Sequence, residues 1–258
     1  MDIRLDGKHA LVLGASQGIG KAVAMELAGL GATITALARD PARLDALQRE
    51  LPGSGHTIIS LDASDTVALS EAMRALAGSK PIGIIVNNSG GPAPGTAHMA
   101  EVAAYEAAFR QHLVAYQTVA LALVPGMKER GHGRIINIIS TSVKQPLHNL
   151  GVSNTIRAAV ANWAKTLANE LGPHGITVNN VLPGATSTER LDAIVRNKAA
   201  KQGISEEAAA EEMRAEIPMR RFARPEEIAH AVAFLAGSAG AYINGINLPV
   251  DGGRTACL

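Results

Sequence analysis

The sequence predicts a single α/β domain built on a doubly wound parallel sheet of about seven strands, with helices on both faces. Short aliphatic runs alternate with longer helical patterns, which is typical of parallel strands joined by right-handed helical crossovers. The composition is 47% hydrophobic but only 3% aromatic, and this suits layers packed through aliphatic side chains and alanine. No linker, repeat or low-complexity stretch divides the chain, so we expect residues 1–258 to form one domain.

Seven runs have the aliphatic character of buried strands. They cover residues 9–15, 32–38, 56–62, 82–88, 133–140, 175–183 and 245–250. Helical patterns lie between successive strands, and the first of them spans residues 18–31. The second is expected over 40–51, where Asp40 stands at the N-cap and Pro41 at the first helical position. This order of elements indicates a Rossmann-type sheet covered on both faces.

A later helix, expected over residues 153–172, carries two polar side chains at its start. Ser153 and Arg157 are four residues apart, so they share one helical face. A separate apolar stripe consists of Ile156, Ala159, Val160, Trp163, Ala164, Leu167 and Leu171. The serine and the arginine therefore do not belong to the predicted core stripe, so core packing does not explain them and a role in a functional site has to be considered.

One segment interrupts the alternation of strands and helices. Residues 188–221 are charged and rich in alanine, and they contain no strand pattern. In a doubly wound fold, an insertion after a late strand lies beside the ligand crevice. We therefore expect residues 188–221 to form a lid over the substrate.

Charge and composition exclude several classes of function. The formal net charge of +1 gives no electrostatic case for binding nucleic acid or an acidic membrane surface. The N-terminus lacks the apolar region of a signal peptide, and no apolar run has the length of a membrane span. A single cysteine, Cys257, allows no internal disulfide, and no His, Cys or carboxylate spacing resembles a metal site. A cytoplasmic protein that acts on a small molecule is the simplest interpretation.

A glycine-rich turn between the first strand and the first helix predicts a phosphate site. Gly14, Gly18 and Gly20 belong to the stretch "GASQGIG", together with Ser16, Gln17 and Ile19. Glycines there permit a tight turn and let the backbone approach a pyrophosphate at the helix N-terminus. The position of the turn after the first strand of an alternating chain makes a dinucleotide the expected ligand.

The end of the second strand predicts which dinucleotide binds. A carboxylate there would accept the ribose hydroxyls of NAD, whereas an arginine suits the 2′-phosphate of NADP. This chain has Arg39 first, and Asp40 is committed to capping the next helix. The planar guanidinium of Arg39 therefore favours NADP(H) over NAD(H). The alternative is that Arg39 is only a solvated arginine beside a helix cap.

Six short motifs occur in an order that carries a family resemblance. They are "GASQGIG", "NNSG" (87–90), "NIIS" (137–140), "LPG" (182–184), "RPEEIA" (224–229) and "VDGG" (250–253). In this combination the chain resembles the short-chain dehydrogenase/reductase family, and within it the 3-oxoacyl-carrier-protein reductases. The only departure in "NNSG" is Ser89, where the family usually has alanine, and we interpret it as an exchange of one small residue for another.

The resemblance implies an oxidoreductase that forms a homodimer or homotetramer, and it assigns the cofactor contacts. Asp62 and Ala63 would border the adenine, and Asn88 and Gly90 would line the adenosine ribose. The residues expected to border the nicotinamide are Pro183, Gly184, Thr186 and Thr188.

The catalytic positions that the resemblance implies are altered. The family uses a serine, a tyrosine about thirteen residues later, a lysine four residues after that, and an asparagine on an earlier helix. Ser140 fits the serine, but Ser153 stands at the tyrosine position and Arg157 at the lysine position. A serine hydroxyl is far too weak an acid to replace a phenol, and an arginine keeps its proton. The chain's three tyrosines, at 105, 116 and 242, lie too far along the sequence to be substitutes.

His112 stands at the family's asparagine position. Phe109, His112, Leu113 and Tyr116 fall on one helical face, so His112 is expected to point inward. It is either a satisfied core residue or part of a proton relay, with His148 as the other candidate proton source. Two functions stay open: an NADP-dependent oxidoreductase with a rearranged relay, in which Arg157 holds ribose or a substrate anion, and an NADPH-binding pseudoenzyme or regulatory partner of an active paralogue.

Overall fold

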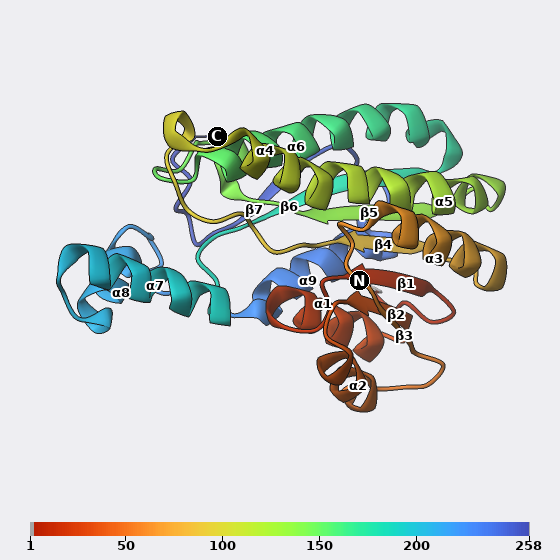
Figure 1. Cartoon of the computed structure of the whole chain (residues 1–258). Coiled ribbons are helices and arrows are strands. Elements are labelled where there is room, and N and C mark those ends of the chain that lie inside the picture. The colour runs from red at the N-terminus through yellow and green to blue at the C-terminus, as the bar shows by residue number, and fades with distance from the viewer. Residues whose placement is uncertain (1–2, 258) are drawn as a thin grey trace.

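The computed structural model describes residues 3–257, and its centre is a sheet of seven parallel strands (Figure 1). The strands are β1 (His9–Leu13), β2 (Thr33–Ala38), β3 (Thr57–Ser60), β4 (Ile84–Asn87), β5 (Gly133–Ile138), β6 (Ile176–Pro183) and β7 (Asn247–Val250). Their order in the sheet is β3-β2-β1-β4-β5-β6-β7. The fold class predicted from the alternation of strands and helices is confirmed.

Nine α-helices lie within the described residues. They are α1 (Gly18–Gly29), α2 (Pro41–Glu50), α3 (Thr66–Ser79), α4 (Val102–Phe109), α5 (Ala115–Glu129), α6 (Gly151–Leu171), α7 (Glu189–Gln202), α8 (Glu206–Ala215) and α9 (Pro225–Ala236). A π-helical turn, Arg110–Val114, joins α4 to α5. None of the helices in residues 3–257 has both the length and the apolar character needed to cross a membrane.

Two hydrophobic cores lie on opposite faces of the sheet because successive strand residues point in opposite directions. In β1, Ala10 and Val12 pack into the core that α1, α2 and α9 cover. Leu11 and Leu13 pack into the core that α3, α5 and α6 cover. Figure 1 shows these two groups of helices on either side of the strands. Burial on both faces explains why the strands are continuous aliphatic runs rather than alternating ones.

The strand order creates a crevice at one edge of the sheet. From β1 the chain moves outward through β2 to β3, then crosses to β4 on the other side of β1 and continues to β7. The connections that leave the carboxyl ends of β1 and β4 therefore diverge. In open parallel sheets, ligands bind at this switch point.

The element boundaries differ slightly from the predicted ones. Asp40 caps α2 as expected, and its carboxylate accepts a hydrogen bond of 3.1 Å from the backbone N–H of Arg43. The first helix ends at Gly29 rather than Gly31, because Gly31 adopts a φ of +100° that a helix does not permit. The helix predicted from residue 153 begins at Gly151, so Ser153 lies inside its first turn.

The segment predicted as a lid forms two helices, α7 and α8, which project from the body of the sheet (Figure 1). They share a small apolar cluster of their own. Its buried members are Leu191, Val195, Ala199, Ala209 and Ala210. Because this cluster is separate from the two sheet cores, the pair of helices packs as a unit. Its role as a substrate lid stays a prediction.

Gly20→Ala should destabilise the protein, because a methyl group there would lie 2.1 Å from the backbone oxygen of Gly14. We expect a loss of about 2 kcal/mol or more in the free energy of unfolding, measured with urea. Gly29→Ala in the same helix is the matched control. Its added methyl meets no atom within 4 Å, so it should leave stability unchanged or raise it by up to ~1 kcal/mol. Equal effects of the two variants would contradict this account of the turn.

Candidate active site

A hollow of about 510 Å³ opens at the carboxyl ends of the central strands. Most of the residues predicted to bind a cofactor line it: Gly14, Ser16, Gln17, Gly18, Ile19, Arg39, Asp62, Ala63, Asn88, Gly90, Arg157, Pro183, Gly184 and Thr188. Gly20 and Thr186 do not belong to the lining. Gly20 packs beneath the turn, and the buried Thr186 donates its hydroxyl proton to the carbonyl of Gly184 over 3.1 Å. These two residues contact the lining residues Gly14 and Gly184 and do not line the hollow themselves.

The glycine-rich turn brings bare backbone to one end of the hollow. Gly14 and Gly18 have φ values of +62° and +54°, which favour glycine. A methyl on Gly14 would lie 2.7 Å from the side-chain nitrogen of Asn88. The N-cap of α1, Gln17, makes no side-chain hydrogen bond to the first turn, so the turn's N–H groups keep their capacity to donate. This geometry suits a pyrophosphate.

Arg39 extends from the end of β2 beside the same end of the hollow. Its side chain is 77% exposed, and its Nη1 lies 3.9 Å from a carboxylate oxygen of Asp62. Asp62 is itself held by Ser64, whose backbone N–H donates over 2.9 Å and lowers the pKa of the carboxyl. Asp40 caps α2, as predicted. At the end of β2, Arg39 therefore offers a cation to a ligand, while Oδ1 of Asp40 is held by the first turn of α2.

Arg43 also lines this end of the hollow, and the sequence analysis missed it. Its Nη1 hydrogen-bonds the side-chain oxygen of Gln17 and pairs with the carboxylate of Glu189 at 3.2 Å. The contact ties α2 to the first residue of α7. A cation in the first turn of a helix opposes the helix dipole, and that unfavourable position was the signal available in the sequence.

Arg157 projects from α6 into the other end of the hollow. Its side chain is only 6% exposed, and burial lowers the pKa of the guanidinium. Nη1 donates to the backbone oxygen of Ile138 over 2.9 Å, and Nη2 donates to that of Ser89 over 3.4 Å. The guanidinium is thus fixed between the ends of β4 and β5.

Ser89 joins two buried polar side chains to the wall of the hollow. Its hydroxyl lies 2.5 Å from Nδ1 of His112 and 2.7 Å from the hydroxyl of Tyr116. Both partners are fully buried. Burial, and secondarily the charge of Arg157, lowers the pKa of His112 to about 3, so its imidazole is neutral at neutral pH. Burial raises the pKa of Tyr116, while the charge of Arg157 acts in the opposite direction.

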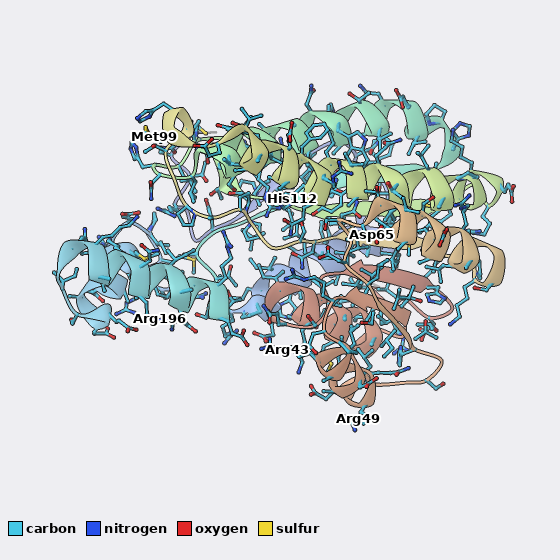
Figure 2. The ribbon with its side chains drawn as sticks, viewed as in Figure 1. Arg43, Arg49, Asp65, Met99, His112 and Arg196 are labelled. Carbon is cyan, nitrogen blue, oxygen red and sulfur yellow. The ribbon has the colours of Figure 1, made fainter. Side chains whose placement is uncertain are left out.

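The π-helical turn Arg110–Val114 explains how His112 reaches this place. An extra residue in the turn changes the angular spacing, so the expected four-residue face is wrong for Phe109, which is 43% exposed. His112 points inward as expected (Figure 2), and its Nε2 has no hydrogen-bond partner within residues 3–257. Two expectations need correction: Ser89 is more than a small filler, and Tyr116 lies one hydrogen bond from the hollow despite its distance in sequence.

The other predicted catalytic residues lie away from the lining. Ser140 caps a short 3₁₀ turn, and its Oγ accepts a 3.1 Å hydrogen bond from the backbone N–H of Ser142. Ser153 is 8% exposed at the start of α6, and His148 is exposed in the loop before that helix. Of the four predicted catalytic side chains, only that of Arg157 lines the hollow.

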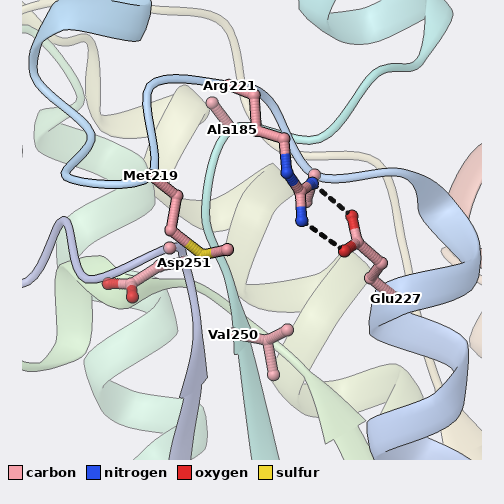
Figure 3. A pocket seen from close by; sticks show the side chains of 8 residues that line it. Ala185, Met219, Arg221, Glu227, Val250 and Asp251 are labelled. Carbon is pink, nitrogen blue, oxygen red and sulfur yellow. Dashed lines mark hydrogen bonds and ion pairs between the residues drawn. The ribbon is translucent and has the colours of Figure 1, made fainter.

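A second, smaller hollow of about 130 Å³ lies near the C-terminus (Figure 3). Arg221 and Glu227 face each other across it and form two hydrogen bonds of 2.7 Å. The charges of this pair are therefore already satisfied, and the larger hollow is the better candidate for an active site.

Comparison with known proteins identifies the family. Residues 14–255 match the family described as enoyl-(acyl carrier protein) reductase. The chain is 33% identical over 253 residues to the NADPH-dependent reductase BacG of Bacillus subtilis, covering 95% of this chain and 97% of that protein. The chain belongs to the short-chain dehydrogenase/reductase family. The family predicted from the six motifs is confirmed, while the likeness to the 3-oxoacyl-carrier-protein reductases within it and the altered catalytic positions stay predictions.

Other family members show the same extent of similarity. The chain is 33% identical over 257 residues to the L-xylulose reductase of Bos taurus, covering 99% of this chain and all of that one. The crystal structure of L-sorbose reductase from Gluconobacter frateurii, complexed with NADPH and L-sorbose, superposes with a TM-score of 0.94 at 31% identity and covers both chains completely. The match over the full length includes the hollow and the α7–α8 segment.

The buried histidines predict that this short-chain dehydrogenase/reductase loses stability in acid. The pKa of His112 is lowered to about 3 and that of the buried His9 to about 4, in both cases mainly by burial. Below the unfolded-state pKa of about 6.5, the unfolded chain binds protons that the folded chain does not. Stability is therefore complete above about pH 6.5 and falls as the pH approaches these folded-state values. From near pH 7.5 to near pH 5, each histidine should cost about 2 kcal/mol.

His112→Asn should remove its own share of this loss, about 2 kcal/mol, and leave that of His9. Urea unfolding of both proteins at the two pH values measures the difference. The same acid loss in both would show that His112 does not stay neutral in the folded protein.

Proposed function

We propose that the chain is an NADP(H)-dependent oxidoreductase that interconverts a carbonyl and a hydroxyl group on a small substrate. The observation that carries the proposal is a single hollow with a glycine-rich turn and Arg39 at one end and Arg157 and Ser89 at the other. The relatives named above support it, because BacG is an NADPH-dependent reductase and two others are reductases of a sugar.

The cofactor end of the hollow fits NADP(H). The α1 N-terminus and the glycines of the turn would hold the pyrophosphate. Arg39 would pair with the 2′-phosphate, with Asp62 and Ala63 along the adenine and Asn88 and Gly90 along the ribose. Pro183, Gly184, Thr186 and Thr188 would form the nicotinamide wall. When bound there, NADPH supplies the hydride that reduces the substrate.

In this proposal the catalytic end lacks the family's usual acid, a tyrosine, and the neighbouring catalytic positions also carry other residues. In the proposed assignment Ser153, Arg157 and His112 stand where the family has tyrosine, lysine and asparagine. Arg157 anchors the nicotinamide ribose or an oxyanion and donates no proton. Ser140, just after β5, is the proposed group that polarises the carbonyl. Its Oγ accepts a hydrogen bond from the backbone N–H of Ser142, which leaves its own O–H able to donate to the substrate.

Ser89 is the proposed path for the proton. Ser89 lines the hollow and its hydroxyl contacts that of Tyr116, and a phenol is the kind of acid that the chemistry needs. Ser89 passes its proton to the substrate oxygen and takes one from Tyr116. Burial raises the pKa of Tyr116 and opposes this step, and the positive charge of Arg157 acts in the opposite direction by favouring the phenolate. His112 positions the Ser89 oxygen through Nδ1. Because the pKa of His112 is lowered to about 3, its imidazole stays neutral and takes up no further proton near neutral pH.

A pseudoenzyme that only binds NADPH is the second candidate. It is favoured by the full burial of Tyr116 and by the position of Ser153 outside the lining of the hollow. Both functions require the same cofactor end. A turnover screen with NADPH on ketones, imines and activated alkenes separates them, since the pseudoenzyme consumes no NADPH on any substrate.

Arg39→Ala should weaken NADPH binding by ~1.5–3 kcal/mol and leave NADH binding unchanged, because only NADPH has the 2′-phosphate. Fluorescence titration of both cofactors measures the two dissociation constants. Arg49→Ala is the control: Arg49 is an exposed arginine at the far end of α2 (Figure 2), and its removal should affect neither cofactor. Equal affinities of the wild type for NADPH and NADH would contradict the proposed role.

Ser89→Ala should lower turnover on the identified substrate at least tenfold, since general acid catalysis contributes typically ~10²–10⁴. Tyr116→Phe should give a similar loss, because it removes the proton behind Ser89. NADPH affinity should stay within about twofold in both variants, since neither hydroxyl is assigned to the cofactor. Full activity of Ser89→Ala would exclude this proton path.

A further inference from the structure

Two arginines from different helices meet above one glycine in the hollow. Arg157 comes from α6 and Arg190 from the first turn of α7, and both line the hollow. A methyl group built on Gly91 would lie 2.7 Å from Nη2 of Arg190 and 3.6 Å from Nη2 of Arg157. The two guanidinium groups therefore approach the same point of the wall.

Neither guanidinium has a carboxylate partner within residues 3–257. Arg157 donates to the two backbone carbonyls described above, and Arg190 donates to those of Gly91 and Pro92 over 3.0 and 3.2 Å. Glu189, next to Arg190 in the chain, pairs instead with Arg43 of α2. The terminal nitrogens of both arginines donate to carbonyl oxygens, which do not neutralise the charges, and the buried Nε of Arg157 has no hydrogen-bond partner among the described residues.

The smaller hollow provides a contrast within the same molecule. There Arg221 faces Glu227 with two hydrogen bonds, and the pair carries no net charge (Figure 3). In the larger hollow, two like charges are held close together and one of them is buried. Their mutual repulsion and the cost of burial would both fall if an oxyanion bound between them.

We propose that Arg157 and Arg190 form a binding site for a carboxylate group of the substrate. The substrate is then an acid with a carbonyl or hydroxyl group, rather than an uncharged sugar. This inference rests on the proposed function and assigns the substrate class of the same site. The cofactor's pyrophosphate is the other possible oxyanion, because Gly18 of the glycine-rich turn approaches Thr188, two residues before Arg190. The turn and the N-terminus of α1 already provide donors for the pyrophosphate, so a carboxylate is the ligand that still needs the two arginines.

The proposed carboxylate site would also help to hold α7 beside the hollow. Arg190 reaches back from the lid helix to the loop after β4, while Glu189 holds α2. A carboxylate bridging Arg157 and Arg190 would connect the body of the domain to the lid at a third point. Substrates with that group would therefore stabilise α7 in the position that the structure shows.

The test compares two small probes on the protein saturated with NADP⁺. Tartrate carries carboxylates, and threitol has the same carbon skeleton with hydroxyl groups in their place. Calorimetric titration at constant ionic strength, adjusted with sodium chloride, removes general screening effects. We expect saturable binding of tartrate and at least tenfold weaker binding of threitol.

Arg190→Gln should weaken tartrate binding at least tenfold and leave the NADP⁺ dissociation constant within about twofold. Arg190→Lys keeps the charge and should restore part of the affinity. Arg196→Gln is the matched control, because it removes an equal charge from an exposed position of the same helix (Figure 2) and should change neither ligand.

Two results would overturn the inference. One is equal binding of tartrate and threitol by the wild type. The other is an Arg190→Gln variant that loses NADP⁺ affinity tenfold, which would assign the arginine to the cofactor's phosphates. The NADP⁺ titration of the wild type tests the proposed function separately: no binding there would reject the cofactor site, whatever tartrate does.

Discussion

The close contact between Gly20 and the carbonyl of Gly14 is the constraint on which the site depends. At this contact, any side chain on Gly20 would overlap the backbone oxygen. It lets α1 begin directly beneath the end of β1, so that its first N–H groups face the crevice opened by the diverging connections of β1 and β4. The sheet order supplies the crevice, and the glycine contact gives it an end suited to phosphate.

Ser89 organises the opposite end in a comparable way. Its backbone oxygen accepts a hydrogen bond from Arg157, and its hydroxyl contacts His112 and Tyr116. One residue at the end of β4 therefore joins α6, the π-helical turn and α5. A buried polar cluster of this kind is stable only when most of its members have partners, which explains why these residue types occur together. The proposed chemistry requires the same connections, because they link a phenol and a fixed cation to the hollow.

Much of this arrangement could be predicted from sequence because it depends on local rules. Aliphatic runs define the strands, Asp40 and Pro41 define a helix start, and the glycine spacing defines the turn. The cluster around Ser89 depends on residues 23 and 27 positions away and on a π-helical turn that a regular helical period does not anticipate. Arg190 was likewise missed, because its meeting with Arg157 depends on how α7 returns over the loop after β4.

The central claim is that one ligand, NADP(H), spans the hollow from Arg39 to Arg157. A crystal structure of the protein with NADP⁺ tests it most directly. We expect the 2′-phosphate within hydrogen-bond distance, about 3 Å, of Arg39, and the nicotinamide half inside the hollow beside Arg157 and Ser89. A nicotinamide half that lies outside the hollow, away from both Arg157 and Ser89, would contradict it.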